Sequence, residues 1–279
     1  MQIDTRNLVT GEHRLPCPVC NKAKRDEALH VTVNPDGSAV WFCHRCHESG
    51  GSRRGRNFRA YTAPPQRPKV ELDTTSRDAR ERAARIWRAS LPVTGTIGAD
   101  YLQARVCAIP PHDGDLRFHA SLWCPETKSE LPALVAKVTT VIGNRAIGLH
   151  RIWIRPGETK AVKKMRLGGS DEPVCIRLWP NDAVTVGLGI AEGIESALSA
   201  AYAMTPVWST IDAGQLAKFP VIAGLESLTV FADYDNIGYR AAKAVCSRYQ
   251  HAHVNANLFR SPIVGEDVND MAMRAESRT

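Results

Sequence analysis

Acidic residues stand at three places in the last third of the chain: Glu192, the pair Asp233 and Asp235, and residues 266–270. The first two places directly follow apolar runs, 184–190 and 228–232, that we expect to be buried strands. The carboxyl ends of neighbouring parallel strands meet at one edge of a sheet, where open α/β proteins bind ligands. Carboxylates crowded there repel one another unless a cation lies among them, so the sequence predicts a magnesium site for phosphate chemistry.

Helix capping is the alternative role for these acids. Asp235 or Asn236 would cap one helix, and Glu192 would stand favourably at the start of another. Capping does not explain why acidic clusters follow separate strands, so we favour the metal site. Glu195, one helical turn after Glu192, is expected to be exposed. Asp212 and Asp270 are expected to be caps.

Two Cys-x-x-Cys pairs near the start of the chain predict a zinc site. The pairs are separated by 22 residues, and their members are Cys17, Cys20, Cys43 and Cys46. Four thiolates supply the tetrahedral set that structural zinc prefers, and the hairpin expected between the pairs would bring them together as a zinc ribbon. His13, His44 and His47 are possible replacement ligands, but four cysteines already complete the shell.

Aromatic and cationic residues around the second pair suit single-stranded nucleic acid. Trp41 could stack against a base and Arg45 could contact a phosphate. The alternative for Trp41 and Phe42 is that they form the hairpin's own core.

The chain divides by composition into four parts. Residues 1–49 form the zinc ribbon, and residues 50–75 read as a mobile basic linker, because 50–69 carries six basic and no acidic residues. Ser76 is expected to cap a helix that ends by Pro92. Residues 76–183 are expected to form a mixed α/β basic subdomain. In residues 184–279 strands and helices alternate, which predicts a mainly parallel sheet flanked by helices.

Two features of the middle part bear on function. Residues 134–141 and 146–154 are strand-like and flank Gly143 and Asn144, which predicts a hairpin. Residues 160–166 are expected to form a basic loop, and from it we select three residues for nucleotide phosphates or the template backbone: Lys163, Lys164 and Arg166. A solvated loop is the alternative, and Arg151 is a weaker candidate.

Charge is spread unevenly along the 279 residues. Residues 134–183 carry 9 basic and 4 acidic groups, whereas residues 184–261 carry 5 and 6. This distribution suggests that the basic segment binds a polyanion while the chemistry occurs at the acidic segment. No apolar run approaches the length of a membrane span, and the start of the chain lacks the order of a secretory signal, so we expect a cytoplasmic protein without membrane partners.

The acidic motifs, Glu-Gly after one strand, Asp-x-Asp-x-x-Gly after another and Asp-x-Asn-Asp downstream, resemble the Toprim domain over about residues 184–275. That domain occurs in primases, topoisomerases, certain nucleases and recombination mediators of the RecR type. With its zinc ribbon and basic middle part, the chain resembles primases of phages and plasmids. The segments AEGIESALSA and FADYDNIGYRAA are similar to Toprim proteins of phages and mobile elements.

The resemblance implies a role for each matching residue. Glu192 matches the family's glutamate, which acts as a general acid or base or associates with metal. Asp233 and Asp235 match the pair that binds magnesium or manganese, and Asp267 matches a further acidic position. The sequence departs from many primases at Ser196, where they carry aspartate, and at Glu266, where lysine is common, which leaves the number of metals open.

The resemblance favours a DNA primase that uses ribonucleoside triphosphates to make short RNA primers on single-stranded DNA. Gly168 and Gly169 are not followed by the Gly-Lys-Ser/Thr of a helicase motor, so a helicase would act in trans. A Toprim nuclease and a non-catalytic RecR-like mediator are the alternatives. The zinc ribbon favours primase, since template selection is its natural use.

Overall fold

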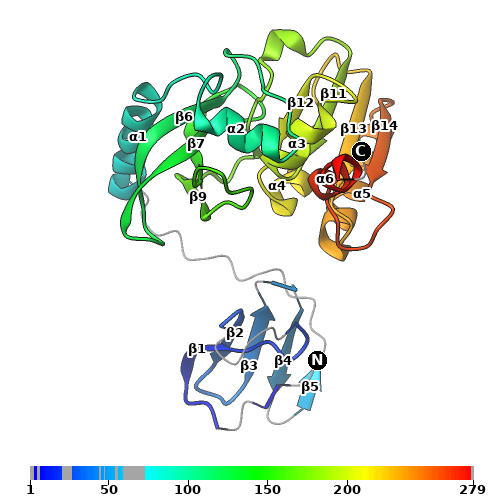
Figure 1. Cartoon of the computed structure of the whole chain (residues 1–279). Coiled ribbons are helices and arrows are strands. Elements are labelled where there is room, and N and C mark those ends of the chain that lie inside the picture. Colours follow the sequence, from blue (N-terminus) through cyan, green and yellow to red (C-terminus); the bar gives the residue numbers. More distant parts are fainter. Residues whose placement is uncertain are drawn as a thin grey trace. The chain divides into compact units, whose positions relative to one another are not determined.

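The computed structural model of the chain describes residues 3–4, 7–20, 27–43, 45–46, 48–53, 56–58 and 73–277. The chain splits into two compact units, Met1–Leu72 and Asp73–Thr279 (Figure 1). No helix in these described ranges is long and apolar enough to cross a lipid bilayer.

The first unit is a five-stranded antiparallel sheet whose strands follow chain order. Alternation of apolar and polar residues explains the central hairpin, because the side chains of Leu29, Val31 and Trp41 all point into one small core. The hairpin predicted between the cysteine pairs is therefore confirmed. Its strands are β1 (Gly11–Leu15), β2 (Leu29–Val33), β3 (Ala39–Cys43), β4 (Ser49–Arg53) and β5 (Arg56–Phe58).

Strands β4 and β5 occupy the start of the segment that composition predicts to be a linker. Gly50 pairs with Trp41 across the sheet, and a Cβ atom on Gly50 would lie 2.7 Å from the Trp41 ring. Glycine is therefore needed where the strand crosses the indole, and the ring compensates for its missing side chain. Residues 59–72, the remainder of the expected linker before the next helix, lie outside the described residues.

The second unit begins with two helices and an antiparallel sheet of order β10-β7-β8-β9, to which β6 adds beside β7. The predicted hairpin is confirmed as β7 and β8, with Gly143 and Asn144 both at positive φ in the connection. Its elements are α1 (Asp73–Arg88), α2 (Ile97–Ala104), β6 (Leu116–Cys124), β7 (Ser129–Thr140), β8 (Ala146–Trp153), β9 (Lys163–Leu167) and β10 (Val174–Cys175).

Two sequence predictions need correction here. Helix α1 begins at Asp73, so Ser76 lies inside the helix and does not cap it. Residues 163–167, expected to be part of a basic loop, form strand β9 and pair antiparallel with β8. The pairing explains this, because Met165 and Leu167 pack against the core beneath α1 while the intervening cations point to the other face.

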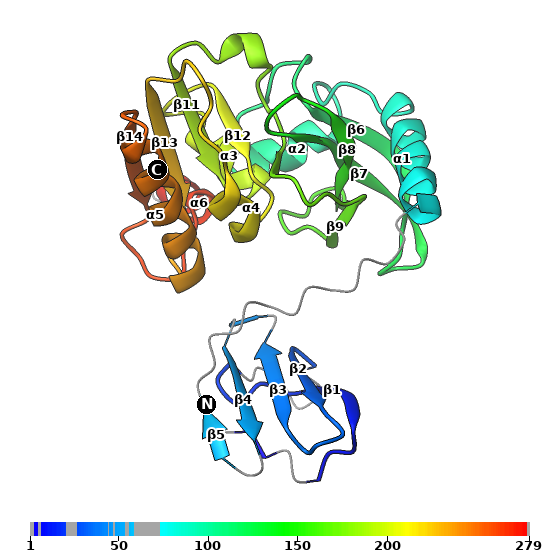
Figure 2. The same cartoon turned by 180° about the vertical axis from the view of Figure 1, so that it is seen from behind.

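The last part of the chain is a four-stranded parallel sheet of order β12-β11-β13-β14, as predicted. Helices α3 and α6 pack on one face and α4 and α5 on the other (Figures 1 and 2). Both faces are covered, which explains the continuous apolar strand sequences. The elements are η1 (Asn181–Ala183), β11 (Gly187–Ala191), α3 (Ile194–Ala200), β12 (Val207–Ser209), α4 (Ala213–Lys218), β13 (Ser227–Ala232), α5 (Asn236–His251), β14 (Asn255–Arg260) and α6 (Val268–Glu276).

The two sheets of the second unit share a core. Leu134 and Ile152 on one face of the antiparallel sheet belong to the same buried cluster as Ile194 and Leu198 of α3. The opposite face is covered by α1, through Ala83 and Ile86. One face of the antiparallel sheet therefore looks toward the parallel-sheet domain, and the other looks toward α1.

Candidate functional site

The four cysteines of the N-terminal unit converge. Their sulfur atoms all lie within 4.8 Å of one another, and within the described residues they are the only such group of three or more His, Cys, Asp or Glu. The Cys17–Cys46 and Cys20–Cys43 sulfurs are each 3.6 Å apart. Four sulfurs at about 2.3 Å around a tetrahedral zinc ion stand about 3.8 Å from each other, so the set fits zinc and is far from disulfide distance.

In the second Cys-x-x-Cys pair, the surroundings of Cys43 favour its thiolate form. The backbone N–H groups of Arg45 and Cys46 donate to the Cys43 sulfur over 3.4 and 3.5 Å. Burial alone would raise the pKa of the Cys43 thiol, but these donors and hydrogen bonds from the Cys46 and Cys20 thiols lower it to about 7. Burial raises the pKa of the Cys46 thiol to about 12. His13 contacts the Val9 carbonyl oxygen, and His44 and His47 lie outside the described residues.

The two residues selected from the ribbon for nucleic-acid contact differ in exposure. Trp41 is only 3% exposed and lies beneath Gly50, so its ring is not available to a base and the core alternative holds. Arg45 is exposed, and its guanidinium donates to the Cys20 carbonyl oxygen over 3.3 Å. Of the two, only Arg45 stays a predicted template contact.

Strand register brings the predicted acidic residues to one edge of the parallel sheet. Ala191 of β11 pairs with Phe231 of β13, so Glu192 and Asp233 leave neighbouring strands at nearly the same level. Helix α5 then begins at Asn236, and Asp235 accepts hydrogen bonds from the N–H groups of Ile237 and Gly238 over 2.8 and 2.7 Å. The predicted convergence of the strand ends is therefore observed, and so is the alternative capping role of Asp235.

Glu192 and Asp233 each bury a carboxylate oxygen that has no hydrogen-bond partner among the described residues. These atoms are Glu192 Oε1 and Asp233 Oδ1. Gly238 makes room for both, since a Cβ atom there would lie 2.7 Å from Glu192 Oε1 and 3.2 Å from the Asp233 Cβ. Buried oxygens of this kind are costly unless something satisfies them, and oxygen ligands are what Mg²⁺ and Mn²⁺ prefer.

The same carboxyls are electrostatically strained. Burial, followed by the charges of Asp233 and Asp235, raises the pKa of Glu192 to about 8. Burial, followed by the charges of Asp267 and Asp235, raises the pKa of Asp233 to about 7. A divalent cation would reverse both shifts, so the Glu192 and Asp233 carboxylates fit a metal ion at this edge. Among the described residues, no three acidic groups here bring their ligand atoms within 4.8 Å of one another, so the fit rests on this pair.

The remaining acids act as caps, as expected for two of them. Asp212 caps α4, and Asp270 belongs to the capping box of α6. Asp267 is the N-cap of α6, and its side chain accepts from the Asp270 N–H over 2.8 Å. Asp267 also raises the pKa of Asp233, so it lies close enough to influence the site.

Strand β9 sends its cations to opposite faces. Lys163 forms an ion pair with Glu126 over 3.1 Å, and its neighbour Met165 packs in the core beneath α1. Lys164 and Arg166 point the other way: Lys164 forms an ion pair with Glu195 of α3 over 2.7 Å, and burial lowers the pKa of Arg166, which the charge of Asp212 raises. The three residues predicted as one basic group are therefore divided, and two of them face the acidic edge.

Glu195 is a functional candidate that the sequence analysis placed wrongly. It is buried, and its Oε1 lies 2.7 Å from the ammonium of Lys164 and accepts a hydrogen bond from the Tyr101 hydroxyl over 3.0 Å. Burial alone would raise the pKa of Glu195, but Lys164 outweighs it and holds the pKa below its ordinary range. Helix α3 is buried on all sides. Its short, mostly small and apolar sequence is the feature from which the burial of Glu195 could have been predicted.

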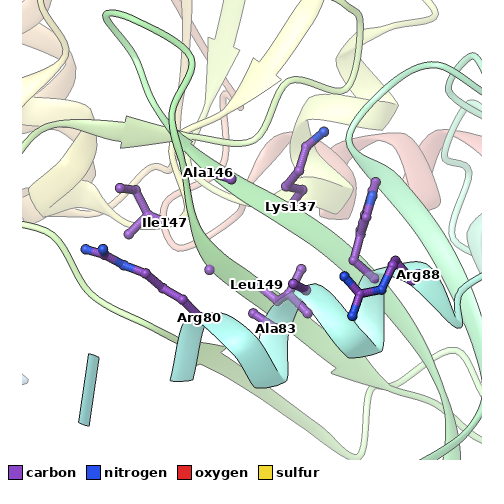
Figure 3. A pocket seen from close by; sticks show the side chains of 10 residues that line it. Arg80, Ala83, Arg88, Lys137, Ala146, Ile147 and Leu149 are labelled. Carbon is purple, nitrogen blue, oxygen red and sulfur yellow. The ribbon is translucent and has the colours of Figure 1, made fainter. Parts of the chain in front are cut away.

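Arg151 and a cavity lie on the face of the antiparallel sheet that looks toward α1. Arg151 is buried beside Trp153, away from the carboxylates. The cavity has a volume of about 290 Å³, with Arg80 and Arg88 of α1 and Lys137 of β7 around Leu149 (Figure 3). Since neither Lys164 nor any of the acidic residues lines it, this cavity is separate from the site.

Comparison with protein families matches two segments of the chain. Residues 187–277 match the Toprim domain, and residues 77–171 match a domain of unknown function, DUF7146. The first match contains Glu192, Asp233, Asp235 and Asp267, so the expected Toprim domain is confirmed over these residues. No match was found among curated proteins.

Three solved structures resemble the chain at low identity. The primase fragment of the bacteriophage T7 primase-helicase protein is 13% identical, with 95% of this chain and 96% of that chain covered and a TM-score of 0.43. The zinc-binding and RNA polymerase domains of the Aquifex aeolicus primase are 14% identical, with coverages of 97% and 78% and a TM-score of 0.43. A DNA primase domain from Pseudomonas aeruginosa is 12% identical, with coverages of 72% and 75% and a TM-score of 0.44.

Proposed function

We propose that this chain is a DNA primase that joins ribonucleotides into short primers on single-stranded DNA. The observation that carries the proposal is the pair of buried carboxylate oxygens of Glu192 and Asp233, which have no hydrogen-bond partner in the part of the chain that the structure describes. They lie at a sheet edge that Lys164 also faces. Acidic oxygens for a metal ion beside a cation for phosphate are the elements that phosphoryl transfer requires. The Toprim match to this segment supports the proposal.

Asp233 and Asp235 are the residues we propose as the principal ligands of a magnesium or manganese ion, with Glu192 and Asp267 beside them. When bound, such an ion supplies positive charge that offsets the charge of a triphosphate. Glu192 would accept a proton from the attacking 3′-hydroxyl or complete a second metal site. Its raised pKa in the metal-free protein is compatible with holding a proton near neutral pH.

Lys164 and Arg166 are proposed to bind the phosphates of the incoming nucleotide or the template. Both cations project from β9 toward the Toprim domain, and the ion pair with Glu195 fixes the ammonium of Lys164. We leave Lys163 out of this set, because it pairs with Glu126 on the other face. Ordered cations contribute more to phosphate binding than mobile ones, since less side-chain entropy is lost on binding.

The N-terminal unit is proposed to select the template start site, with zinc held by the four cysteines and Arg45 as a phosphate contact. A replicative helicase acting in trans would supply single-stranded DNA. A Toprim nuclease is the second candidate, because the same carboxylates could assist cleavage in place of joining. The zinc ribbon favours the primase, because template selection is its natural use.

The test is incubation of the full-length chain with single-stranded DNA, four ribonucleoside triphosphates and magnesium or manganese. We expect labelled oligoribonucleotides from the wild type and a loss of at least about a thousandfold in Asp233→Asn, since this removes a charge that the transition state requires. Lys163→Gln is the matched control and should retain synthesis, whereas Lys164→Gln should lose most of it. Shortened DNA without new RNA would establish the nuclease, and DNA binding without turnover would establish the mediator.

A further inference from the structure

Two tyrosine rings and two cations gather beside the acidic edge. The guanidinium of Arg260 lies 3.9 Å from the ring centre of Tyr234 and 5.0 Å from that of Tyr239, and the Lys243 ammonium lies 4.9 Å from the Tyr239 ring centre. We call these four residues the tyrosine–arginine surface. Because Tyr234 stands between Asp233 and Asp235, this surface adjoins the proposed metal site directly.

Register explains how the surface forms. Arg260 is the last residue of β14 and pairs with Ala232, the last residue of β13. Its side chain therefore lies on the face of the sheet that α5 covers, where Tyr239 occupies the first turn of that helix. Arginine placed at this strand end reaches the rings on both neighbouring segments.

The backbone of Tyr234 is held firmly. Its N–H donates to the Glu266 carbonyl oxygen over 3.0 Å, and its own carbonyl oxygen accepts from the Gly265 N–H over 2.9 Å. Glu266 is in turn fixed by two hydrogen bonds from the Arg274 guanidinium. A pre-positioned ring loses little entropy when a ligand stacks nearby.

Lys243 and Arg260 form no ion pair with any residue in the described ranges, and their charged groups lie over the tyrosine rings instead. Arg260 is half-buried, so part of its side chain is accessible to a ligand. An arginine stacked on a tyrosine presents its other face to a flat partner.

We propose that the tyrosine–arginine surface binds single-stranded DNA, with a base stacked on the Arg260–Tyr234 pair and a phosphate near Lys243. Flat side chains and guanidinium planes hold unpaired bases in this way, and duplex DNA would not offer its base faces. The identification of the strand as template DNA rests on the proposed function. The geometry of the surface does not depend on it.

The test separates stacking from charge. Binding of the full-length protein to a labelled single-stranded oligodeoxynucleotide is compared with binding to an abasic oligomer of the same length, without ribonucleotides. Arg260→Lys keeps the charge and removes the plane, so we expect affinity for the base-containing strand to fall on the order of tenfold and affinity for the abasic strand to stay unchanged. Tyr239→Leu should act in the same direction.

Arg240→Lys is the matched control, because Arg240 is an exposed arginine on the same helix that stacks on neither tyrosine. It should leave both affinities unchanged. Thermal melting shows whether each variant remains folded. Equal effects of Arg260→Lys on both oligomers, unchanged binding of both, or tighter binding of an RNA strand of the same sequence would overturn the proposal.

The outcome is independent of primer synthesis. If the wild type makes no primers but shows the base-dependent pattern, the proposed function fails and the DNA-binding surface stands. If Arg260→Lys binds DNA like the wild type while primers are made, the surface fails and the proposed function stands.

Discussion

The ammonium of Lys164 lies 2.7 Å from Oε1 of Glu195, a side chain only 4% exposed, whereas the Lys164 side chain is 46% exposed. The pair joins β9 of the antiparallel sheet to α3 of the Toprim domain. The Tyr101 hydroxyl of α2 donates to the same oxygen. A buried carboxylate thus fixes the tip of a cation whose charge reaches Asp233.

Glu195→Gln should therefore impair nucleotide binding without touching the reacting groups. Glutamine keeps the shape and can accept the Tyr101 hydrogen bond, but it lacks the charge that orders Lys164. We expect the KM for ribonucleoside triphosphates to rise on the order of tenfold while kcat changes less, as for a lost binding interaction. Glu172→Gln, at the exposed pair with Arg145, is the control and should leave both constants unchanged. An unaltered KM in Glu195→Gln would show that the pair is only structural.

Stability of the magnesium-free protein should fall as pH rises from about 4 to 8. The folded-state pKa is about 8 for Glu192 and about 7 for Asp233, well above the ordinary values near 4. The folded chain then holds protons that the unfolded chain has lost, so the free energy of unfolding decreases through this window. Magnesium favours the charged forms, so it should raise the melting temperature more at about pH 8 than at about pH 5.

The double variant Glu192→Gln/Asp233→Asn isolates this effect. His150 contributes with the opposite sign, because burial lowers its pKa to about 4 and its neutral folded form is favoured as pH rises toward 6.5. The double variant retains His150 but should lose both the decline toward pH 8 and the response to magnesium. A magnesium shift of equal size at both pH values in the wild type would contradict the assignment.

Spacing and strand order made much of the site predictable. A hairpin between two Cys-x-x-Cys pairs brings their four sulfurs together. In the structure, the Cys17–Cys46 and Cys20–Cys43 sulfurs are each 3.6 Å apart. Acids that directly follow parallel strands must share an edge, so the sequence alone places Glu192 and Asp233 together. Both inferences depend only on local pattern and on the parallel direction of the strands.

Tertiary partners made the rest unpredictable. Lys163 and Lys164 are adjacent in a run that the sequence predicts to be a basic loop, and only pairing with β8 sends them to opposite faces. Glu195 looks like an exposed helix residue until α2 and β9 are known to cover it. From the sequence, Trp41 could stack on a base or belong to the core of the hairpin. Only its close contact with Gly50 decides for the core.

Loss of one zinc ligand should abolish metal binding by the N-terminal unit. Cys43→Ser removes the sulfur that accepts two backbone hydrogen bonds, and three thiolates hold zinc far less tightly. We expect about one zinc ion per chain in the wild type and little in the variant, by atomic emission on dialysed protein. Synthesis on random templates should persist weakly, while start-site choice is lost.

Cys246→Ser is the control for this experiment. Cys246 is buried in the Toprim domain, and it is not among the four sulfurs that converge. Its replacement should leave the zinc content unchanged. Equal zinc content in Cys43→Ser and the wild type would contradict the ligand assignment.

Gly238→Ala should weaken divalent-metal binding at the acidic edge. A Cβ atom at this position would lie 2.7 Å from Glu192 Oε1 and 3.0 Å from the Asp233 carbonyl oxygen. The carboxylate is the more movable of the two, so we expect Glu192 to be displaced from Asp233. Glycine to alanine in a helix contributes about 1 kcal/mol of stability where the backbone permits it, which should offset much of the contact.

Calorimetric titration with Mn²⁺ on the full-length protein, together with melting temperatures, tests this prediction. Affinity should fall on the order of tenfold in Gly238→Ala with little change in melting temperature, as for a lost or misplaced ligand. Gly187→Ala is the matched control, since a Cβ atom there would meet no atom within 4 Å. If Gly238→Ala bound Mn²⁺ as tightly as the wild type, Glu192 would not belong to the metal site. Its buried oxygen would then need another partner.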